Sequence, residues 1–179
     1  MGTYIHTSVE VRKDAGWAAN EDAVFTADPT WPGMEGEKLT IRPFFNQNYA
    51  LFALLTGRRD VPGITPIGIS RGLPTDTTED SLQKLAGNYE YTRWDDPDAV
   101  LTVDERVRGR INLDRVGFSW IGVDELLAID YGIQVIDPCE PGSLITLGEA
   151  LGSLYLKHLS QIKSLGNPVN TRVLFCFDD

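Results

Sequence analysis

Apolar and polar residues alternate near the start of the chain. Between Tyr4 and Arg12, the apolar residues Ile5, Val9 and Val11 stand among polar neighbours. Alternation with β-branched residues predicts a strand that is buried on one face. The sequence KDAG that follows is typical of a turn, so residues 17–25 are expected to return as the second strand of a hairpin.

The other end of the chain has a different pattern. Residues 171–177 read TRVLFCF, a nearly continuous apolar run that predicts a strand in the centre of a sheet. Pairing with the N-terminal strand is the simplest arrangement. Helical patterns stand between the two terminal strands, at residues 46–56, 77–86, 120–129 and 144–165. The sequence therefore predicts one α+β domain over residues 1–179: a mostly antiparallel sheet that contains both terminal strands and is covered by helices.

Glycine and proline punctuate two long connections. Residues 26–43 are expected to form a surface loop, and residues 57–76 a second one of about twenty residues. Loops of that length are uncommon inside a compact domain and tend to be functional or disordered, and the isoleucines Ile64, Ile67 and Ile69 favour order. The second loop carries Arg58, Arg59 and Arg71.

The net charge narrows the range of partners. Among 179 residues, 26 are acidic and 16 are basic, which gives a formal net charge of −10. This balance argues against general nucleic-acid binding and against binding to anionic membranes, because both need a positive field.

No apolar run approaches the roughly 20 residues of a membrane span, and the first residues lack the apolar core of a secretion signal. A cytoplasmic protein is expected. Whether it forms a homo-oligomer stays open.

Common catalytic and metal-binding signatures are absent from the sequence, so no cofactor, metal or catalytic residue is assigned. Cys139 and Cys176 are expected to be reduced and mostly buried. His158 is expected on the surface of the long helix, whereas His6, on the first strand, is a candidate site residue. Adjacent carboxylates such as Asp124 and Glu125 do not face one another on a helix, so they form no ready acid–base pair.

The arginine-bearing loop is the richest candidate. Guanidinium groups bind phosphate or carboxylate with two parallel hydrogen bonds, and the neighbouring glycines let backbone N–H groups approach an anion. Aromatic rings can stack on a nucleotide base. The predicted ligand-binding residues are therefore His6, Tyr49, Arg58, Arg59, Arg71 and Trp120. In the alternative interpretation the arginines pair with surface acids and hold the loop down, Arg71 with Asp60 or Asp76.

Five segments carry a resemblance to a known family. They read YIHTSVEVR, NYALFALLTGRRD, RGLPTD, FSWIGVDELL and TRVLFCFDD, in this order. Together they resemble a family of poorly characterised proteins encoded mainly by bacteriophages. Its members open with Asp-Ile-His, continue with RNY-x-LFA and RG-[LV]-P-x-D, carry HSHSW, and end in F-x-FD. The resemblance leaves residues 26–43 and 88–112 uncovered.

The departures from that pattern concern its histidines. Tyr4 stands where the family has aspartate, and Val116 and Phe118 stand where it has the two histidines of HSHSW. An Asp-x-His and a His-x-His pair can bind a metal or perform acid–base chemistry. Only His6 of that set is kept here, which favours binding over catalysis.

Three functions from different classes follow. The resemblance implies a phage protein, and the leading hypothesis is a counter-defence protein of the host bacterial cytoplasm that sequesters a small anionic, nucleotide-derived immune signal. The first alternative is a nucleotide-acting enzyme that uses His6 with a carboxylate such as Asp124. The second is a virion-associated or host-protein-binding protein that acts through the loop at residues 26–43.

Overall fold

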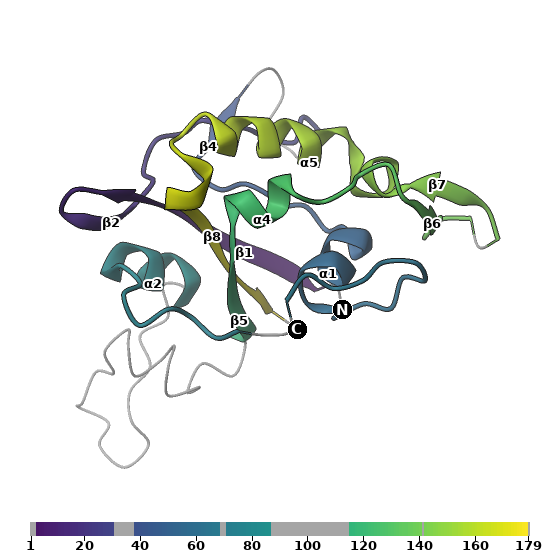
Figure 1. The fold of residues 1–179 in the computed structure, drawn as a ribbon, viewed down its shortest axis with the longest axis horizontal. Coiled ribbons are helices and arrows are strands. Elements are labelled where there is room, and N and C mark those ends of the chain that lie inside the picture. The colour runs from purple at the N-terminus through teal and green to yellow at the C-terminus, as the bar shows by residue number, and fades with distance from the viewer. Residues whose placement is uncertain (1–2, 31–37, 69–70, 87–114, 141, 179) are drawn as a thin grey trace, which may run out of the picture.

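The two terminal strands pair along almost their whole length. Strand β1 (Tyr4–Lys13) and strand β8 (Thr171–Asp178) are antiparallel, from Tyr4 opposite Asp178 to Val11 opposite Thr171. Strand β8 lies between β1 and β5 (Arg115–Gly122), and the sheet order is β2-β1-β8-β5 (Figure 1). The predicted α+β fold and the pairing of its terminal strands are confirmed.

The computed structural model describes residues 3–30, 38–68, 71–86, 115–140 and 142–178. Short strands and helices complete the part of the chain that it describes. They are β2 (Gly16–Ala19), β3 (Phe25–Thr26), β4 (Leu39–Thr40), α1 (Tyr49–Thr56), α2 (Glu79–Ala86), α4 (Val123–Leu127), β6 (Gln134–Ile136), β7 (Leu144–Thr146), α5 (Leu147–Lys163) and a 3-10 turn at Pro168–Asn170. Of the loop expected at 26–43, residues 31–37 lie outside the described residues.

The two faces of the sheet are covered unequally. On one face Val173, Phe175 and Phe177 belong to the main core, which includes buried residues of α1, α4 and α5. The Phe52 ring of α1 meets the Phe177 ring edge-on, with 5.2 Å between centroids. On the other face, α2 packs through Leu85 against alternate residues of β8. Figure 1 shows α2 on the side of the sheet opposite α5.

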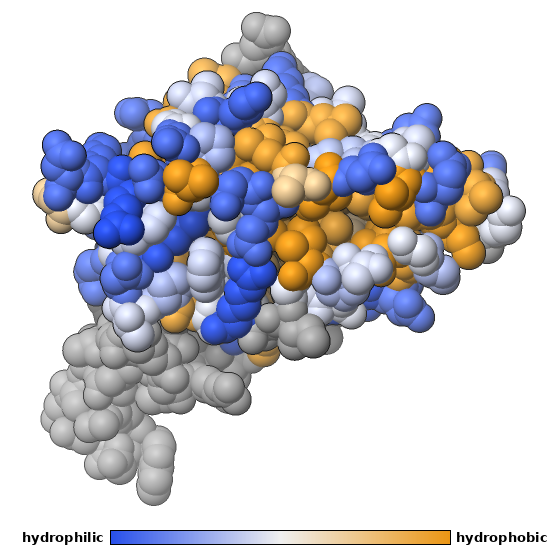
Figure 2. All heavy atoms as spheres, viewed as in Figure 1, coloured by the Kyte–Doolittle hydropathy of each residue, from blue (hydrophilic) through white to orange (hydrophobic). Residues whose placement is uncertain are grey.

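The outer surface is also divided. In Figure 2 hydrophobic atoms gather over α4 and toward the β6–β7 hairpin, whereas the end of the molecule around β2 is hydrophilic. Exposed Ile133, Leu144 and Leu156 contribute apolar side chains to the surface. The polar and apolar parts of this face therefore separate along the length of the molecule.

A buried ion pair joins the two terminal strands on the α2 face. Glu10 is fully buried, and its Oε2 accepts a hydrogen bond from Arg172 Nε at 2.8 Å. Its Oε1 accepts from the N–H and Oγ1 of Thr78, at 2.9 and 2.7 Å. Arg172 also donates to Asp76 at 2.9 Å and lies over the Trp17 ring, 3.9 Å from its centroid. Because Thr78 directly precedes α2, this network holds the start of that helix against the sheet.

Two predicted helices begin later than expected. Trp120 was placed on a helix, but it lies on β5, and the helix α4 starts only at Val123. The long helix was expected from Leu144, but residues 144–146 form strand β7, because Thr146 caps α5 by accepting from Glu149 N–H at 3.2 Å. Strand periodicity over three to eight residues is easily read as part of a following amphipathic helix.

The expectation that His158 faces solvent is wrong. His158 is fully buried, with Nδ1 accepting from the Phe44 N–H at 3.0 Å and Nε2 lying 2.7 Å from the Thr26 carbonyl oxygen. This pattern requires a neutral ring with its proton on Nε2. Burial lowers the pKa of His158, and the charge of Lys157 lowers it further, against the hydrogen bond to Thr26, which raises it.

The two carboxylates that bind Arg172, Glu10 and Asp76, should contribute very differently to the free energy of unfolding. Glu10→Gln leaves Arg172 buried beside a neutral amide, so we expect it to lower the free energy of unfolding by about 3–5 kcal/mol. Asp76→Asn removes an exposed partner of the same guanidinium and should cost less than about 1 kcal/mol. Urea denaturation of both variants measures this difference. Equal losses would show that burial of Glu10 does not set the strength of the pair.

His158 predicts a pH dependence of stability. Its folded-state pKa lies below the unfolded value of 6.5, so the unfolded chain takes up a proton that the folded chain resists. The contribution of His158 is therefore complete above about pH 6.5 and declines as pH falls toward the folded pKa. His158→Leu should cost about 1–3 kcal/mol at pH 7, because Phe44 N–H and the Thr26 carbonyl lose their partner. The gap between parent and variant should narrow from pH 7 to pH 5 in urea titrations, and a constant gap would contradict the neutral ring.

Candidate anion-binding site

Among the residues that the structure describes, no strand pairs with the first half of β1 on its outer side. Strand β2 pairs only with residues 10–13 of β1. The connection before α1 covers the remaining edge: Thr7 Oγ1 donates to the Pro43 carbonyl at 2.7 Å, and Gln47 Nε2 donates to the Thr3 carbonyl at 3.1 Å. Covering a bare edge with a loop is a common way to protect it. Here it also brings Arg42, the residue before Pro43, beside His6.

A bulge in β5 brings a second arginine to the same face. Val116 pairs with Phe177 and Ser119 with Phe175, so Gly117 and Phe118 together oppose one residue of β8. Gly117 takes φ +66°, a conformation that suits glycine. Because side chains alternate along a strand, this extra residue inverts the alternation beyond it. Arg115, opposite Asp178, therefore lies on the His6 face rather than on the core face.

These residues line a cavity of about 370 Å³ between β1, β5 and α2. Its basic side chains outnumber its acidic ones in a chain whose net charge is −10. Lys84, from α2, is held at the wall by a 3.1 Å hydrogen bond from Nζ to the Asn20 carbonyl. The lining residues are His6, Glu21, Arg42, Asp80, Gln83, Lys84 and Arg115.

Arg42 and Arg115 lack acidic partners within the described ranges. Neither guanidinium forms a salt bridge to a described carboxylate, and Arg115 Nη1 is buried with no hydrogen-bond partner among the described residues. Burial lowers the pKa of Arg42, and the nearby charge of Arg115 lowers it further. Two neighbouring, partly buried like charges repel each other, and an anion between them would relieve that repulsion.

His6 adds a neutral, oriented imidazole to the cavity. Its Nε2 lies 2.8 Å from Asp178 Oδ2, while Asp178 Oδ1 accepts from the Tyr4 N–H at 2.9 Å. Burial lowers the pKa of His6, the hydrogen bond to Asp178 raises it, and the charges of Arg115 and Arg42 lower it. The net pKa lies below 6.5, so the ring is mainly neutral at pH 7. The proton then sits on Nε2, facing the carboxylate, and Nδ1 is left as an acceptor.

The cysteines supply no reactive group to this cavity. Cys176 is buried, and burial raises the pKa of its thiol to about 12. A thiol with that pKa stays protonated and is a poor nucleophile. Cys139 is a free, exposed thiol, so the expectation that both cysteines are buried is wrong for this residue.

Of the six residues predicted from the sequence, His6 alone lines this cavity. Arg58 lies over the Phe177 ring, 5.4 Å from its centroid. Arg59 lies over the exposed Tyr49 ring at 5.0 Å and donates to Thr3 Oγ1 at 2.8 Å. These two arginines therefore hold the chain after α1 against the strand ends.

Arg71 is held by an acid that the sequence reasoning did not name. Its two terminal nitrogens donate to both oxygens of Glu125, at 2.8 and 2.7 Å, and its guanidinium lies over the Trp120 ring at 5.4 Å. Asp76, one of the two partners considered, bonds Arg172 instead. Trp120 itself packs beside Leu85 and Leu174. Arg71 thus has its fork occupied within the protein.

Sequence reasoning missed Arg42, Lys84 and Arg115. Arg42 stands in a segment that was interpreted only as a surface loop. Arg115 is brought to the site by the bulge, which simple alternation does not reveal. The one readable signal was in β1, where His6, Ser8 and Glu10 stand at every second position and so share a face of the strand.

Comparisons with known proteins supply no relative for this chain. No protein-family model and no curated protein matches the sequence, and no solved structure matches the fold. The roles of its residues must therefore be argued from its own geometry. In the part of the chain that the structure describes, no helix is long and apolar enough to cross a membrane, and no group of three or more metal-ligating side chains is gathered.

Removing either partner of the Arg71–Glu125 pair should abolish the whole contribution of the pair to stability. Both side chains are about one-third exposed, so Arg71→Ala and Glu125→Ala should each lower the free energy of unfolding by no more than about 1 kcal/mol. The double variant should lose less than the sum of the two, because each single change removes the same contact. Protease cutting between Gly57 and Thr75 should rise in each variant. Additive losses would show that the pair is not a unit.

Proposed function

We propose that this protein binds and sequesters a small anion in the cavity lined by His6, Arg42, Lys84 and Arg115. One observation carries the proposal: two neighbouring, partly buried guanidiniums line one cavity, and neither forms a salt bridge to a described carboxylate. The other arginines discussed above that pair with acids, Arg71 and Arg172, meet well-placed carboxylates. Arg59 Nε is also buried without a hydrogen-bond partner, but Arg59 lies over the Tyr49 ring, whereas Arg42 and Arg115 line a cavity that can hold an anion.

The proposed ligand is small and nucleotide-derived. The overall charge of −10 repels long polyanions, whereas a compact anion needs only the local cluster of cations. The resemblance to phage-encoded proteins adds the biological role: sequestering a nucleotide-derived signal of bacterial immunity in the host cytoplasm. Guanidinium forks and a neutral imidazole acceptor suit phosphate groups and ribose hydroxyls, respectively.

The His6–Asp178 pair favours a second candidate, a nucleotide-acting enzyme. A carboxylate that holds one nitrogen of a neutral imidazole leaves the other nitrogen ready to take a proton. In this candidate the carboxylate is Asp178 rather than Asp124. His6 lies opposite Cys176 of β8. Gly122, two residues before Asp124, lies opposite Arg172, which is four residues away from Cys176 along β8. That separation corresponds to about 13 Å along the strand. Intact recovery of the ligand after heat denaturation supports sequestration, and a converted product supports the enzyme.

Arg115→Gln tests the proposal because binding and stability should change in opposite directions. Removing a partly buried charge that repels Arg42 and forms no salt bridge to a described carboxylate should leave the melting temperature unchanged or raise it. Losing a charge-assisted hydrogen bond should weaken anion binding by about 1.5–3 kcal/mol, more than tenfold. The measurement is a thermal-shift and calorimetric titration with cyclic nucleotides, ADP-ribose derivatives and pyrophosphate.

Arg12→Gln is the matched control, because Arg12 lies on the same strand as His6 but is exposed and outside the cavity. It should leave binding unchanged. A lowered melting temperature with unchanged affinity in Arg115→Gln would mean that Arg115 is structural. No binding by the parent across the panel would refute the proposed function.

A further inference from the structure

A second cavity adjoins the cationic one. It has a volume of about 250 Å³ and shares His6 and Arg42 with its neighbour. The two cavities therefore meet at these side chains. Half of its lining residues are aromatic or aliphatic, namely Tyr4, Ile5, Ala27 and Phe45, and the other half are His6, Asp28, Thr40 and Arg42.

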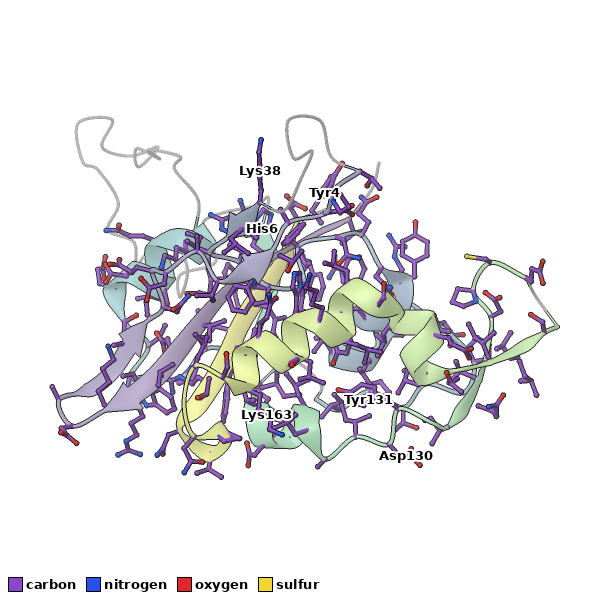
Figure 3. The ribbon with its side chains drawn as sticks, turned by 90° about the horizontal axis from the view of Figure 1, so that it is seen from above. Tyr4, His6, Lys38, Asp130, Tyr131 and Lys163 are labelled. Atoms are coloured by element: carbon purple, nitrogen blue, oxygen red, sulfur yellow. The ribbon has the colours of Figure 1, made fainter. Side chains whose placement is uncertain are left out.

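The two aromatic residues come from different segments: Tyr4 from β1 and Phe45 from the connection between β4 and α1. Tyr4 and His6 are two residues apart on β1 and so share a face of the strand. Figure 3 shows both at the same edge of the molecule, opposite Lys163 and Tyr131. Tyr4 is 46% exposed, although its N–H is fixed by Asp178. It presents a largely unburied ring on an anchored backbone.

Phe45 is anchored differently. It follows Arg42 in the segment that covers the edge of β1, and its ring centroid lies 5.4 Å from that of the buried His158. Because His158 is itself held by Phe44 and Thr26, this wall of the cavity is tied to the core. One aromatic wall is therefore fixed and the other is open to solvent.

We propose that the paired cavities form a nucleotide site, in which the base occupies the Tyr4–Phe45 cavity and the phosphate occupies the Arg42–Arg115 cavity. This inference rests on the proposed function and adds where the rest of the ligand lies. His6 and Arg42 stand at the junction, where the sugar would lie. Taken together, the two cavities fall within the range of roughly 300–1,000 Å³ that is usual for small-molecule sites. Aromatic rings accept any base on their faces, and the neighbouring cations supply the charge that a phosphate needs.

The test is calorimetric titration of the full chain with inorganic phosphate, ribose 5-phosphate and the four ribonucleoside 5′-monophosphates. At least one nucleotide should bind about tenfold or more tightly than ribose 5-phosphate, because the base adds stacking. Tyr4→Ser and Phe45→Leu should each reduce this preference, with little change in the affinity for ribose 5-phosphate. Arg115→Gln should weaken both ligands together.

Tyr49→Ser is the matched control. Tyr49 is also an exposed tyrosine, 51% accessible, but it does not line either cavity, so the base preference should survive its loss. Equal binding of nucleotides and ribose 5-phosphate, still dependent on Arg115, would overturn this inference and leave the proposed function standing. If Tyr4→Ser and Phe45→Leu both leave the base preference intact, the base binds elsewhere, and that result would also overturn the inference. If none of these compounds binds, this inference fails, and the proposed function is then decided by the titrations with cyclic nucleotides, ADP-ribose derivatives and pyrophosphate.

Discussion

Glu10 and Arg172 lie opposite each other in β1 and β8, and the register that they share organises the rest of the molecule. A shift of one residue would move the buried phenylalanines of β8 to the polar face and would separate a fully buried carboxylate from its cation. With the register set, His6 stands opposite Cys176, and Asp178 lies within hydrogen-bonding distance of the His6 ring. The position of the candidate site is thus a consequence of the pairing between the two ends of the chain.

The arginines of the protein lie in different electrostatic environments. Arg172 and Arg71 meet carboxylates through well-placed hydrogen bonds, and both also lie over indole rings. Arg42 and Arg115 meet no described carboxylate, and each carries its charge into the same cavity. Arg71 and Arg172 hold loops to the sheet through carboxylates, and Arg58 and Arg59 hold the chain after α1 through aromatic rings, whereas Arg42 and Arg115 line the cavity. This contrast is the physical basis for distinguishing structural from functional guanidiniums here.

Irregularities in the sheet create the site. Because β2 is short, the edge of β1 is left to the segment that carries Arg42 and Phe45. Because Gly117 opens a bulge, Arg115 is turned to the face of His6. In a regular four-stranded sheet, a longer β2 would cover the edge of β1 where Arg42 now lies. Without the bulge, Arg115 would face the core. Bulges and covered edges of this kind often re-aim side chains at sites.

Local patterns in the sequence were enough to predict the terminal strands, the hairpin after β1, the helices α1 and α2 and the α+β class. Hydrophobic periodicity and caps act over a few residues, as the bond from Leu51 N–H to the N-cap side chain of Asn48 illustrates. Only the tertiary structure decided that His158 is buried, that Arg71 meets Glu125 54 residues away, and that Arg115 faces His6. An arginine can pair with any carboxylate that the fold brings near, so the sequence does not reveal its partner. A bulge reverses which side chains of a strand face the core, and it leaves the amino-acid composition of the strand unchanged. Sequence periodicity therefore determined the elements, and long-range packing determined which side chains remain available for a ligand.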